Sequence, residues 1–290
     1  MLSIALPKGS LEEQTFMLFA QADLPIKKGR RQYNSIADDP RIDKIKILRP
    51  QEIPKYVEEG YFDLGISGKD CIVESGANVI EVADMPYAKT GTGKMKMIIA
   101  VPDDSIIEKP EDILVNSRVT TEFPNITKAY FDKLGIPVKV YYSYGATEAK
   151  IPEIMDVVVD LTETGETLRR NQLKIIGTVM ESTTRLIANK DSWENEEKRK
   201  AIEEIKTLLL GVLEARDRVL MSMNVSKDNL EGVIEALPAM KRPTVNQLYN
   251  SDYLEVTTVV DKANVNILIP RLKEQGAEDI LEMDIAKIVR

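Results

Sequence analysis

The spacing of apolar residues divides most of the chain into alternating strands and helices. Helical spacing or a terminal glycine marks residues 11–22, 49–57 and 124–134 as helices. Short runs rich in Val, Ile and Leu are typical of buried strands. These runs occupy residues 2–6, 45–48, 63–67, 79–83, 95–101, 118–122, 138–142 and 157–161. This alternation predicts two α/β lobes.

The connections between these lobes are also visible in the pattern. Residues 84–94 read as a crossing from one lobe to the other, and predicted strands at 174–179 and 183–188 lead back. Such a double crossing leaves a cleft between the lobes. The expected bounds are residues 1–93 and 180–212 for the first lobe and 94–179 for the second.

The last third of the chain follows a different order. Asn189–Ser192 should cap a long helix from 193 to 217, which has strong helix formers and a regular apolar stripe. The predicted order after it is β-α-β-β-α-β, the ferredoxin-like arrangement of small regulatory domains. Its elements span residues 218–225, 227–236, 243–248, 253–260, 262–275 and 279–289. We therefore expect residues 213–290 to form a separate domain with an effector or assembly role.

The stretch from Asp156 to Thr178 carries the most chemical information. Thr162–Thr167 lies between a buried strand and a helix that begins near Glu166. Three hydroxyls, a glycine and unpaired backbone N–H groups at a helix start can hold an oxyanion. An ordinary capped turn is the alternative, since Thr and Gly are common at helix starts. Glu163 and Glu166 also oppose an anion site unless they point to solvent.

Other polar residues follow predicted strands in the same way. Asp160 ends the strand before the threonine loop, at the edge where open α/β sheets collect ligands. A carboxylate there can accept hydrogen bonds from sugar hydroxyls or hold a hydrated Mg²⁺. Lys8 and the basic cluster Lys28–Arg31 could each contact a phosphate or simply lie in solvent. The remaining strand-end residues are Gly9, Arg49 and Asp70.

Composition narrows the chemistry further. The chain has 290 residues, 43% of them hydrophobic and 30% charged, which is typical of a soluble protein, and its net charge of −8 does not favour sequence-independent nucleic-acid binding. A long apolar run and a signal-peptide pattern are not visible, so we expect a cytoplasmic location. Cys71 is the only cysteine and histidine is absent, which excludes intrachain disulfides, histidine-dependent triads and nearly every zinc site. Carboxylates, cations, hydroxyls, backbone dipoles or a hard metal ion must do any catalysis, and these groups suit phosphate chemistry.

Asp156–Leu173, DVVVDLTETGETLRRNQL, resembles the signature by which ATP phosphoribosyltransferases bind phosphoribosyl pyrophosphate. The resemblance covers essentially the whole chain and identifies the long form of this family, the first enzyme of histidine biosynthesis. One departure is Ser10, where the family usually has Arg; Arg30, Arg31 or Arg49 could supply the missing cation. Further segments similar to the family are Ala5–Gly9, Asp63–Asp70, Thr121–Asn125 and Arg242–Val245.

The resemblance implies a fold and a reaction. The fold is a two-lobed, type II periplasmic-binding-protein-like catalytic core followed by an ACT-like domain through which histidine inhibits. The reaction, a glycosyl transfer, joins N1 of ATP to C1 of phosphoribosyl pyrophosphate and releases pyrophosphate with Mg²⁺. Adenine N1 attacks through a lone pair and has no proton to lose, so the absence of histidine is no obstacle. The family forms dimers that assemble into hexamers.

It also implies roles for the strand-end residues. Asp160 would hold the ribose hydroxyls, Glu148 would accept from the adenine amino group, and Lys8 would act with them in catalysis. The 5-phosphate would be held by Thr162, Glu163, Thr164, Gly165, Glu166 and Thr167. ATP or pyrophosphate would contact Lys8, Gly9, Arg49 and Asp70.

Two other classes share a two-lobed cleft. Solute-binding proteins and regulator effector domains are non-enzymatic examples. The first should begin with a signal peptide and the second should carry a DNA-binding helical module; neither is visible. A phosphoribosyltransferase that acts on a different base is the nearer alternative.

Overall fold

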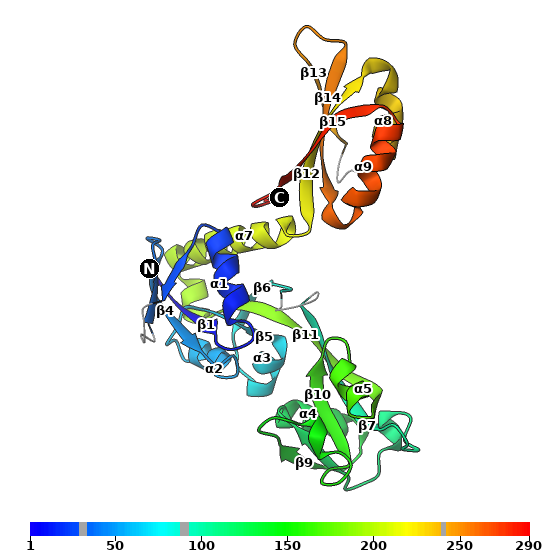
Figure 1. The fold of residues 1–290 in the computed structure, drawn as a ribbon. Coiled ribbons are helices and arrows are strands. Elements are labelled where there is room, and N and C mark those ends of the chain that lie inside the picture. Colours follow the sequence, from blue (N-terminus) through cyan, green and yellow to red (C-terminus); the bar gives the residue numbers. More distant parts are fainter. Residues whose placement is uncertain (29–33, 88–92, 239–241) are drawn as a thin grey trace. The chain divides into compact units, whose positions relative to one another are not determined.

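The computed structural model describes residues 1–28, 34–87, 93–238 and 242–290 (Figure 1). These residues form two compact units, Met1–Lys206 and Thr207–Arg290. The first unit contains a mixed sheet with the strand order β2-β3-β4-β1-β5-β11-β7-β10-β8-β9, and β6 also pairs with β11. Within the described residues, no helix is long and apolar enough to span a membrane.

The first lobe is built around strand β1 (Leu2–Pro7). Parallel strands β4 (Ile42–Leu48) and β5 (Leu64–Gly68) flank β1, whose Ile4 and Leu6 are fully buried. Strands β2 and β3 pair antiparallel, and β3 pairs with the outer side of β4; the residues 29–33 between β2 and β3 lie outside the described residues. The lobe also contains β2 (Ile26–Lys28), β3 (Asn34–Ala37), β6 (Ile80–Asp84), α1 (Glu12–Gln21), α2 (Ile53–Glu58) and α3 (Lys69–Ser75).

The second lobe has strand β10 (Val157–Thr162) at its centre. This strand runs antiparallel to β7 (Lys94–Pro102) and parallel to β8 (Arg118–Thr121). Its valines at 157, 158 and 159 are fully buried because neighbours cover both faces, as the β-branched run predicts. The lobe also contains β9 (Lys139–Tyr142), η1 (Pro110–Asp112), η2 (Glu148–Lys150), α4 (Pro124–Leu134) and α5 (Glu166–Arg170).

One long strand, β11 (Leu173–Ala188), joins the lobes. Its first part pairs with β7 and its last part pairs with β5 and β6. Two separate strands, 174–179 and 183–188, were expected here, and this prediction was wrong. The polar segment between them stays in the ladder with β7, and the irregularity appears instead as two register shifts between Ile175 and Met180.

The predicted helix from 193 to 217 was also wrong in its start and its continuity. The structure has a short helix α6 (Lys190–Glu194) and a long helix α7 (Glu196–Ala215), separated at Asn195. Asn195 has an extended backbone, and its side chain accepts the backbone N–H of Lys198 at 3.0 Å. It thus gives α7 a cap of its own. The predicted cap before α6 is confirmed, because Asn189 accepts the backbone N–H of Ser192 at 3.1 Å.

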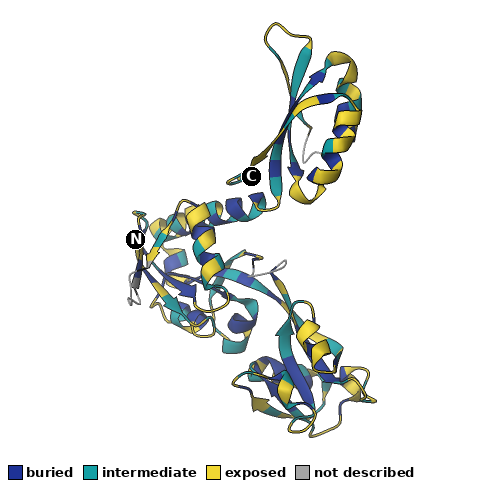
Figure 2. Ribbon diagram, viewed as in Figure 1, coloured by how far each residue is buried: buried dark blue, intermediate teal, exposed yellow. Residues whose placement is uncertain are grey.

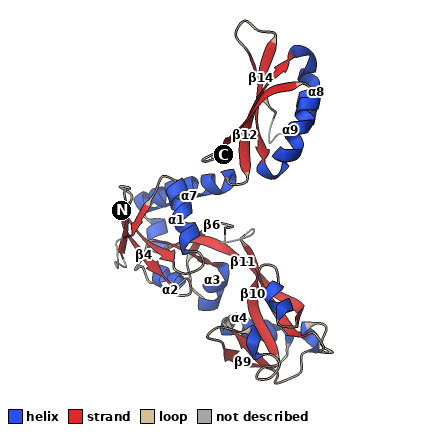
Figure 3. Ribbon diagram, in the orientation of Figure 1, coloured by secondary structure: helices blue, strands red, loops and turns tan. Residues whose placement is uncertain are grey.

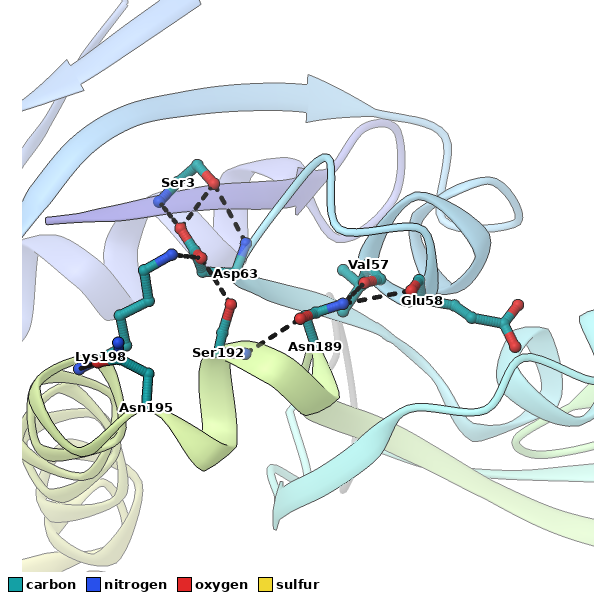
Figure 4. Close-up of polar contacts among 8 residues, drawn as sticks. All are labelled: Ser3, Val57, Glu58, Asp63, Asn189, Ser192, Asn195 and Lys198. Carbon is teal, nitrogen blue, oxygen red and sulfur yellow. Dashed lines mark hydrogen bonds and ion pairs between the residues drawn. The ribbon is translucent and has the colours of Figure 1, made fainter.

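A buried carboxylate anchors these helices to the first lobe (Figure 4). One oxygen of Asp63 accepts the Ser3 backbone N–H at 2.7 Å and the Ser3 hydroxyl at 2.8 Å. The other accepts the Ser192 hydroxyl at 2.7 Å and the Lys198 ammonium at 2.6 Å. Burial alone would raise the pKa of Asp63, but hydrogen bonds from Lys198, Ser192 and Ser3 outweigh it and hold that pKa at about 2.

The second unit has the predicted β-α-β-β-α-β order (Figure 3). Its antiparallel sheet has the strand order β13-β14-β12-β15. Alternate residues of β12, from Val219 to Val225, are buried in one core with side chains of α8 and α9. The outer sides of both helices are exposed (Figure 2). The elements are β12 (Arg218–Ser226), η3 (Lys227–Asn229), α8 (Leu230–Ala236), β13 (Thr244–Gln247), β14 (Tyr253–Asp261), η4 (Lys262–Asn264), α9 (Val265–Glu274) and β15 (Ala277–Asp284).

The predicted fold class is confirmed. Two α/β lobes joined by strand β11 form the type II periplasmic-binding-protein-like core, and a ferredoxin-like antiparallel domain follows. The exact lobe bounds stay a prediction. The two compact units divide between Lys206 and Thr207.

Candidate active site

A cleft of about 440 Å³ collects residues from both lobes and from the crossing strand. Asp160 and Glu163 contribute from the second lobe, and Asp70 contributes from the first. Strand β11 adds Ser182, Thr183 and Thr184. Three of the predicted site residues, Asp70, Asp160 and Glu163, therefore line one cavity although they come from two separate parts of the sequence.

Asp160 is the most electrostatically unusual carboxylate of the cleft. Burial raises its pKa to about 6; the backbone N–H of Leu161, which donates to it at 2.7 Å, opposes the shift, and the charges of Glu122 and Glu148 add to it. Strongly perturbed groups in a cleft are typical of functional sites. The ionised form of Asp160 is therefore one that a hydroxyl donor or a cation bound in the cleft would stabilise.

Glu122 is a cleft residue that the sequence analysis did not single out. Val159 and Thr121 are the last paired residues of β10 and β8, so Asp160 and Glu122 come next on the two neighbouring chains. Both side chains line the cleft. The rule that ligands gather at the carboxyl ends of strands could have found Glu122, because it ends the predicted strand 118–122.

The threonine loop leads into helix α5, and Gly165 is the N-cap residue of that helix. This glycine has φ of 71°, a left-handed conformation that other residues adopt at a cost. Thr162 accepts the Gly165 N–H at 2.8 Å, and Thr164 lies 3.4 Å from the Glu166 N–H. The loop thus uses part of its hydrogen-bonding capacity to hold its own shape. Helix α5 begins at Glu166, directly after this turn.

The two glutamates of this loop lie differently. Glu166 forms an exposed ion pair with Arg170 at 2.5 Å, one helical turn away, and so points to solvent. Glu163 instead lines the cleft. A carboxylate there repels phosphate but suits hydroxyl groups or a hydrated cation.

The predicted cations gather at neighbouring strand ends in the first lobe. Strands β1 and β4 pair in parallel up to Pro7 and Leu48, and the Lys8 N–H donates to the Leu48 carbonyl at 2.7 Å. Lys8, Gly9 and Arg49 are exposed. The residues that directly follow them in the sequence, Ser10 after Gly9 and Pro50 after Arg49, line the cleft.

Asp70 has hydrogen bonds to the crossing strand. Its carboxylate accepts the Ser182 hydroxyl at 2.5 Å, and its N–H donates back to that hydroxyl at 3.1 Å. A Cβ at Gly68 would lie 2.3 Å from the Asp70 carboxylate, so a larger residue at this position would displace that carboxylate. Burial and the Asp70 charge raise the pKa of the neighbouring Cys71 thiol, so Cys71 is a poor nucleophile. Asp70 is therefore fixed in place at the cleft wall.

Other predicted residues are less directly placed. Glu148 is half-buried in η2, and its charge raises the pKa of Asp160, although it is not part of the cleft lining. Arg30 and Arg31, which could replace the cation missing at Ser10, lie outside the described residues. Of the three candidate arginines, Arg49 is the one that lies within the described residues.

The described residues contain no cluster of three or more His, Cys, Asp or Glu that could hold a metal ion. The cleft does offer single carboxylates, from Asp160, Glu122 and Glu163. Mg²⁺ commonly binds through one or two carboxylates together with substrate phosphates and water. This donor set therefore fits an ion that enters with a phosphate ligand.

Comparisons with known proteins agree on one family. A family model described as HisG, ATP phosphoribosyltransferase, matches residues 49–211, and a model of the HisG C-terminal domain matches residues 215–287. The ATP phosphoribosyltransferase of Pelotomaculum thermopropionicum is 44% identical over 288 residues, 99% of each chain. That of Solibacter usitatus is 45% identical over 289 residues, which covers 100% of this chain and 99% of the relative.

A solved structure supports the same assignment. The ATP phosphoribosyl transferase (HisG:HisZ) complex from Thermotoga maritima has a TM-score of 0.61 and 25% sequence identity. The match covers 72% of this chain and 99% of that chain. Family models, full-length relatives and fold coincide, so this chain belongs to the ATP phosphoribosyltransferase family, in its long form with a C-terminal domain.

Proposed function

We propose that the cleft carries out the family's reaction with Asp160 and the loop Thr162–Thr167 as the donor site. In this proposal Asp160 accepts hydrogen bonds from the ribose hydroxyls of phosphoribosyl pyrophosphate, and the loop hydroxyls and N–H groups hold the 5-phosphate. The supporting observation is the position of Asp160, half-buried near the carboxyl end of β10, lining the cleft and two residues before the loop. Glu163, which lines the cleft, belongs with the sugar or a cation.

The reaction is a pentosyl transfer to N1 of ATP, the first step of histidine biosynthesis. Adenine N1 attacks C1 of the ribose, the C1–O bond to pyrophosphate breaks, and the bonding electrons leave with pyrophosphate. The protein must align two polyanions and stabilise an oxocarbenium-like centre. We assign Lys8, Gly9, Arg49 and Asp70 to ATP or the leaving pyrophosphate, and Glu148 to the adenine amino group.

Mg²⁺ belongs to this proposal as a companion of the pyrophosphate. When bound, it neutralises part of the charge on the leaving group. Single carboxylates such as Asp160 or Glu122 suit such an ion, because they need supply only one ligand each. The cationic side chains at the strand ends of β1 and β4 reduce the same repulsion from the protein side.

Substitution of Asp160 tests the donor site. We expect Asp160→Ala to raise KM for phosphoribosyl pyrophosphate and to lower kcat, by about ten-fold or more in kcat/KM, because a charged hydrogen-bond partner is lost. Steady-state kinetics with both substrates would measure these changes in KM and kcat. Asp104→Asn, at an exposed site in the same lobe, is the control. If Asp160→Ala left both constants unchanged, the assignment would be wrong.

We propose further that the second unit binds histidine and that this binding inhibits the transfer. The proposal rests on the ferredoxin-like order of residues 218–290 and on the match to the family's C-terminal domain. Inhibition requires histidine to bind two states of the enzyme with different affinities. Assembly into dimers and hexamers, and action in the cytoplasm, are the forms we propose for the working enzyme.

A truncated chain tests this regulatory role. Removal of the C-terminal domain should abolish inhibition by histidine and leave the cleft able to catalyse the transfer. Pyrophosphate release, measured with and without histidine, would report both properties. A folded, active truncation that histidine still inhibits would contradict the proposal.

A further inference from the structure

Helix α3 has two carboxylates one turn apart, Asp70 and Glu74. Each of them accepts hydrogen bonds from a different element of the fold. Asp70, at its first turn, holds Ser182 of the crossing strand. Glu74, four residues later, lies on the same side of the helix and is half-buried. Only Asp70 was expected to have a role. The partners of Glu74 lie in the second lobe.

Glu74 caps helix α4 across the two lobes. One carboxylate oxygen accepts the Asn125 N–H at 2.9 Å and the other accepts the Ile126 N–H at 3.0 Å. The Asn125 side chain returns a bond to the Glu74 carbonyl at 3.0 Å. The first N–H groups of a helix have no partner within the helix, and a negative charge there is stabilised by the dipole. The local N-cap residue, Phe123, has no side-chain acceptor to offer them.

This contact lies beside the proposed substrate cleft. A second hollow of about 240 Å³ is lined by Glu74, Asn125 and Tyr142. It shares Gln51, Cys71, Glu122 and Phe123 with the cleft that contains Asp160. The two hollows are thus continuous along their walls. A change in the contact between Glu74 and α4 would alter the separation of the walls that carry the proposed donor and ATP residues.

We propose that Glu74 is a positioning residue that sets the lobe separation needed for the transfer. The inference rests on the proposed function, in which one substrate contacts each lobe. The distance between adenine N1 and ribose C1 then depends on the distance between the lobes, and small errors in such alignment reduce rates strongly. Glu74 acts through α4 and contacts no reacting atom.

The lobe separation can be measured without reference to activity. Spin labels on the full chain at Glu59→Cys and Lys109→Cys, two exposed sites in different lobes, would report the distance by electron double resonance. Native Cys71 is buried and can stay. We expect a narrow distance distribution with Glu74 present and a longer, broader one in Glu74→Ala. Glu74→Gln, which keeps an acceptor but loses the charge, should fall between them.

Glu58 provides a matched control. It also accepts a backbone N–H, from Asn78 at 2.8 Å, but both residues belong to the first lobe. Glu58→Ala should leave the distance distribution unchanged. In kinetics, Glu74→Ala should lower kcat/KM for both substrates to a similar extent, by about ten-fold or more, because two hydrogen bonds to a charged group are lost.

The possible results separate this inference from the proposed function. An unchanged distance distribution in Glu74→Ala, or an equal change in Glu58→Ala, would overturn the role of Glu74. A changed distribution without any loss of kcat/KM would also overturn it. Failure of the donor site would appear differently, as an Asp160→Ala enzyme with normal kinetics, while the distance measurement is unaffected by it.

Discussion

At the scale of single residues, Asp160 is held in a state that costs stability. Its pKa of about 6 in the folded chain lies above the ordinary value of 3.8, so folding is weakened when the carboxyl ionises. The stability of the chain should therefore fall as pH rises from about 4 to about 6. We predict that Asp160→Asn is more stable than the parent above pH 6, by roughly 2 kcal/mol, and that it loses activity.

Denaturant unfolding of both proteins at pH 4 and pH 7.5 would measure this difference. The gain should be largest at pH 7.5 and much smaller at pH 4, where the folded carboxyl is protonated and the unfolded one, with its ordinary pKa of 3.8, is about half ionised. A constant difference at both pH values would show that the substitution acts through packing and not through the charge of Asp160.

At the scale of elements, Asp63 joins the start of β1 to helices α6 and α7. Its pKa of about 2 lies below the ordinary value, so its contribution is fully present above about pH 4 and is lost as pH falls toward 2. The shift corresponds to about 2 kcal/mol. Its side chain is only 12% exposed, so the loss of Lys198 would leave a largely buried charge with fewer partners.

We predict that Lys198→Met lowers the free energy of unfolding at pH 7 by about 2 kcal/mol or more. Lys200→Met, an exposed position on the same helix, should have little effect. Thermal or urea unfolding would compare the three proteins. Equal stability of Lys198→Met and the parent would mean that the Asp63 ion pair contributes nothing.

Most elements were predictable because their patterns are local. The valine run of β10, the Pro124 start and Gly135 end of α4, and the order of the second unit all follow from spacing and caps. The continuity of strand β11 was not predictable. Pairing with β7 keeps its polar residues extended, and strand pairing is not visible in the local sequence. The break at Asn195 was missed because Asn occurs both inside helices and at caps. The contact of Glu74 with α4 joins residues 51 and 52 positions apart and has no local signal.

At the scale of the whole molecule, two units with separate cores should unfold in separate steps. The first unit has its cores in the two lobes, and the second has its own core around β12. A ligand stabilises only the unit that binds it, by about 2.7 kcal/mol at one hundred times Kd. We predict that phosphoribosyl pyrophosphate raises the Tm of one transition and that histidine raises the Tm of the other. Calorimetry that showed both ligands shifting the same transition would contradict separate sites.

The central claim is that the loop after Asp160 holds the ribosyl donor. A crystal structure of the full chain with phosphoribosyl pyrophosphate and Mg²⁺ tests it most directly. The account predicts the 5-phosphate within hydrogen-bond distance of the loop Thr162–Thr167 and the ribose hydroxyls on the Asp160 carboxylate. A donor whose 5-phosphate lies elsewhere in the cleft, with the loop empty or occupied by ATP phosphates, would contradict it.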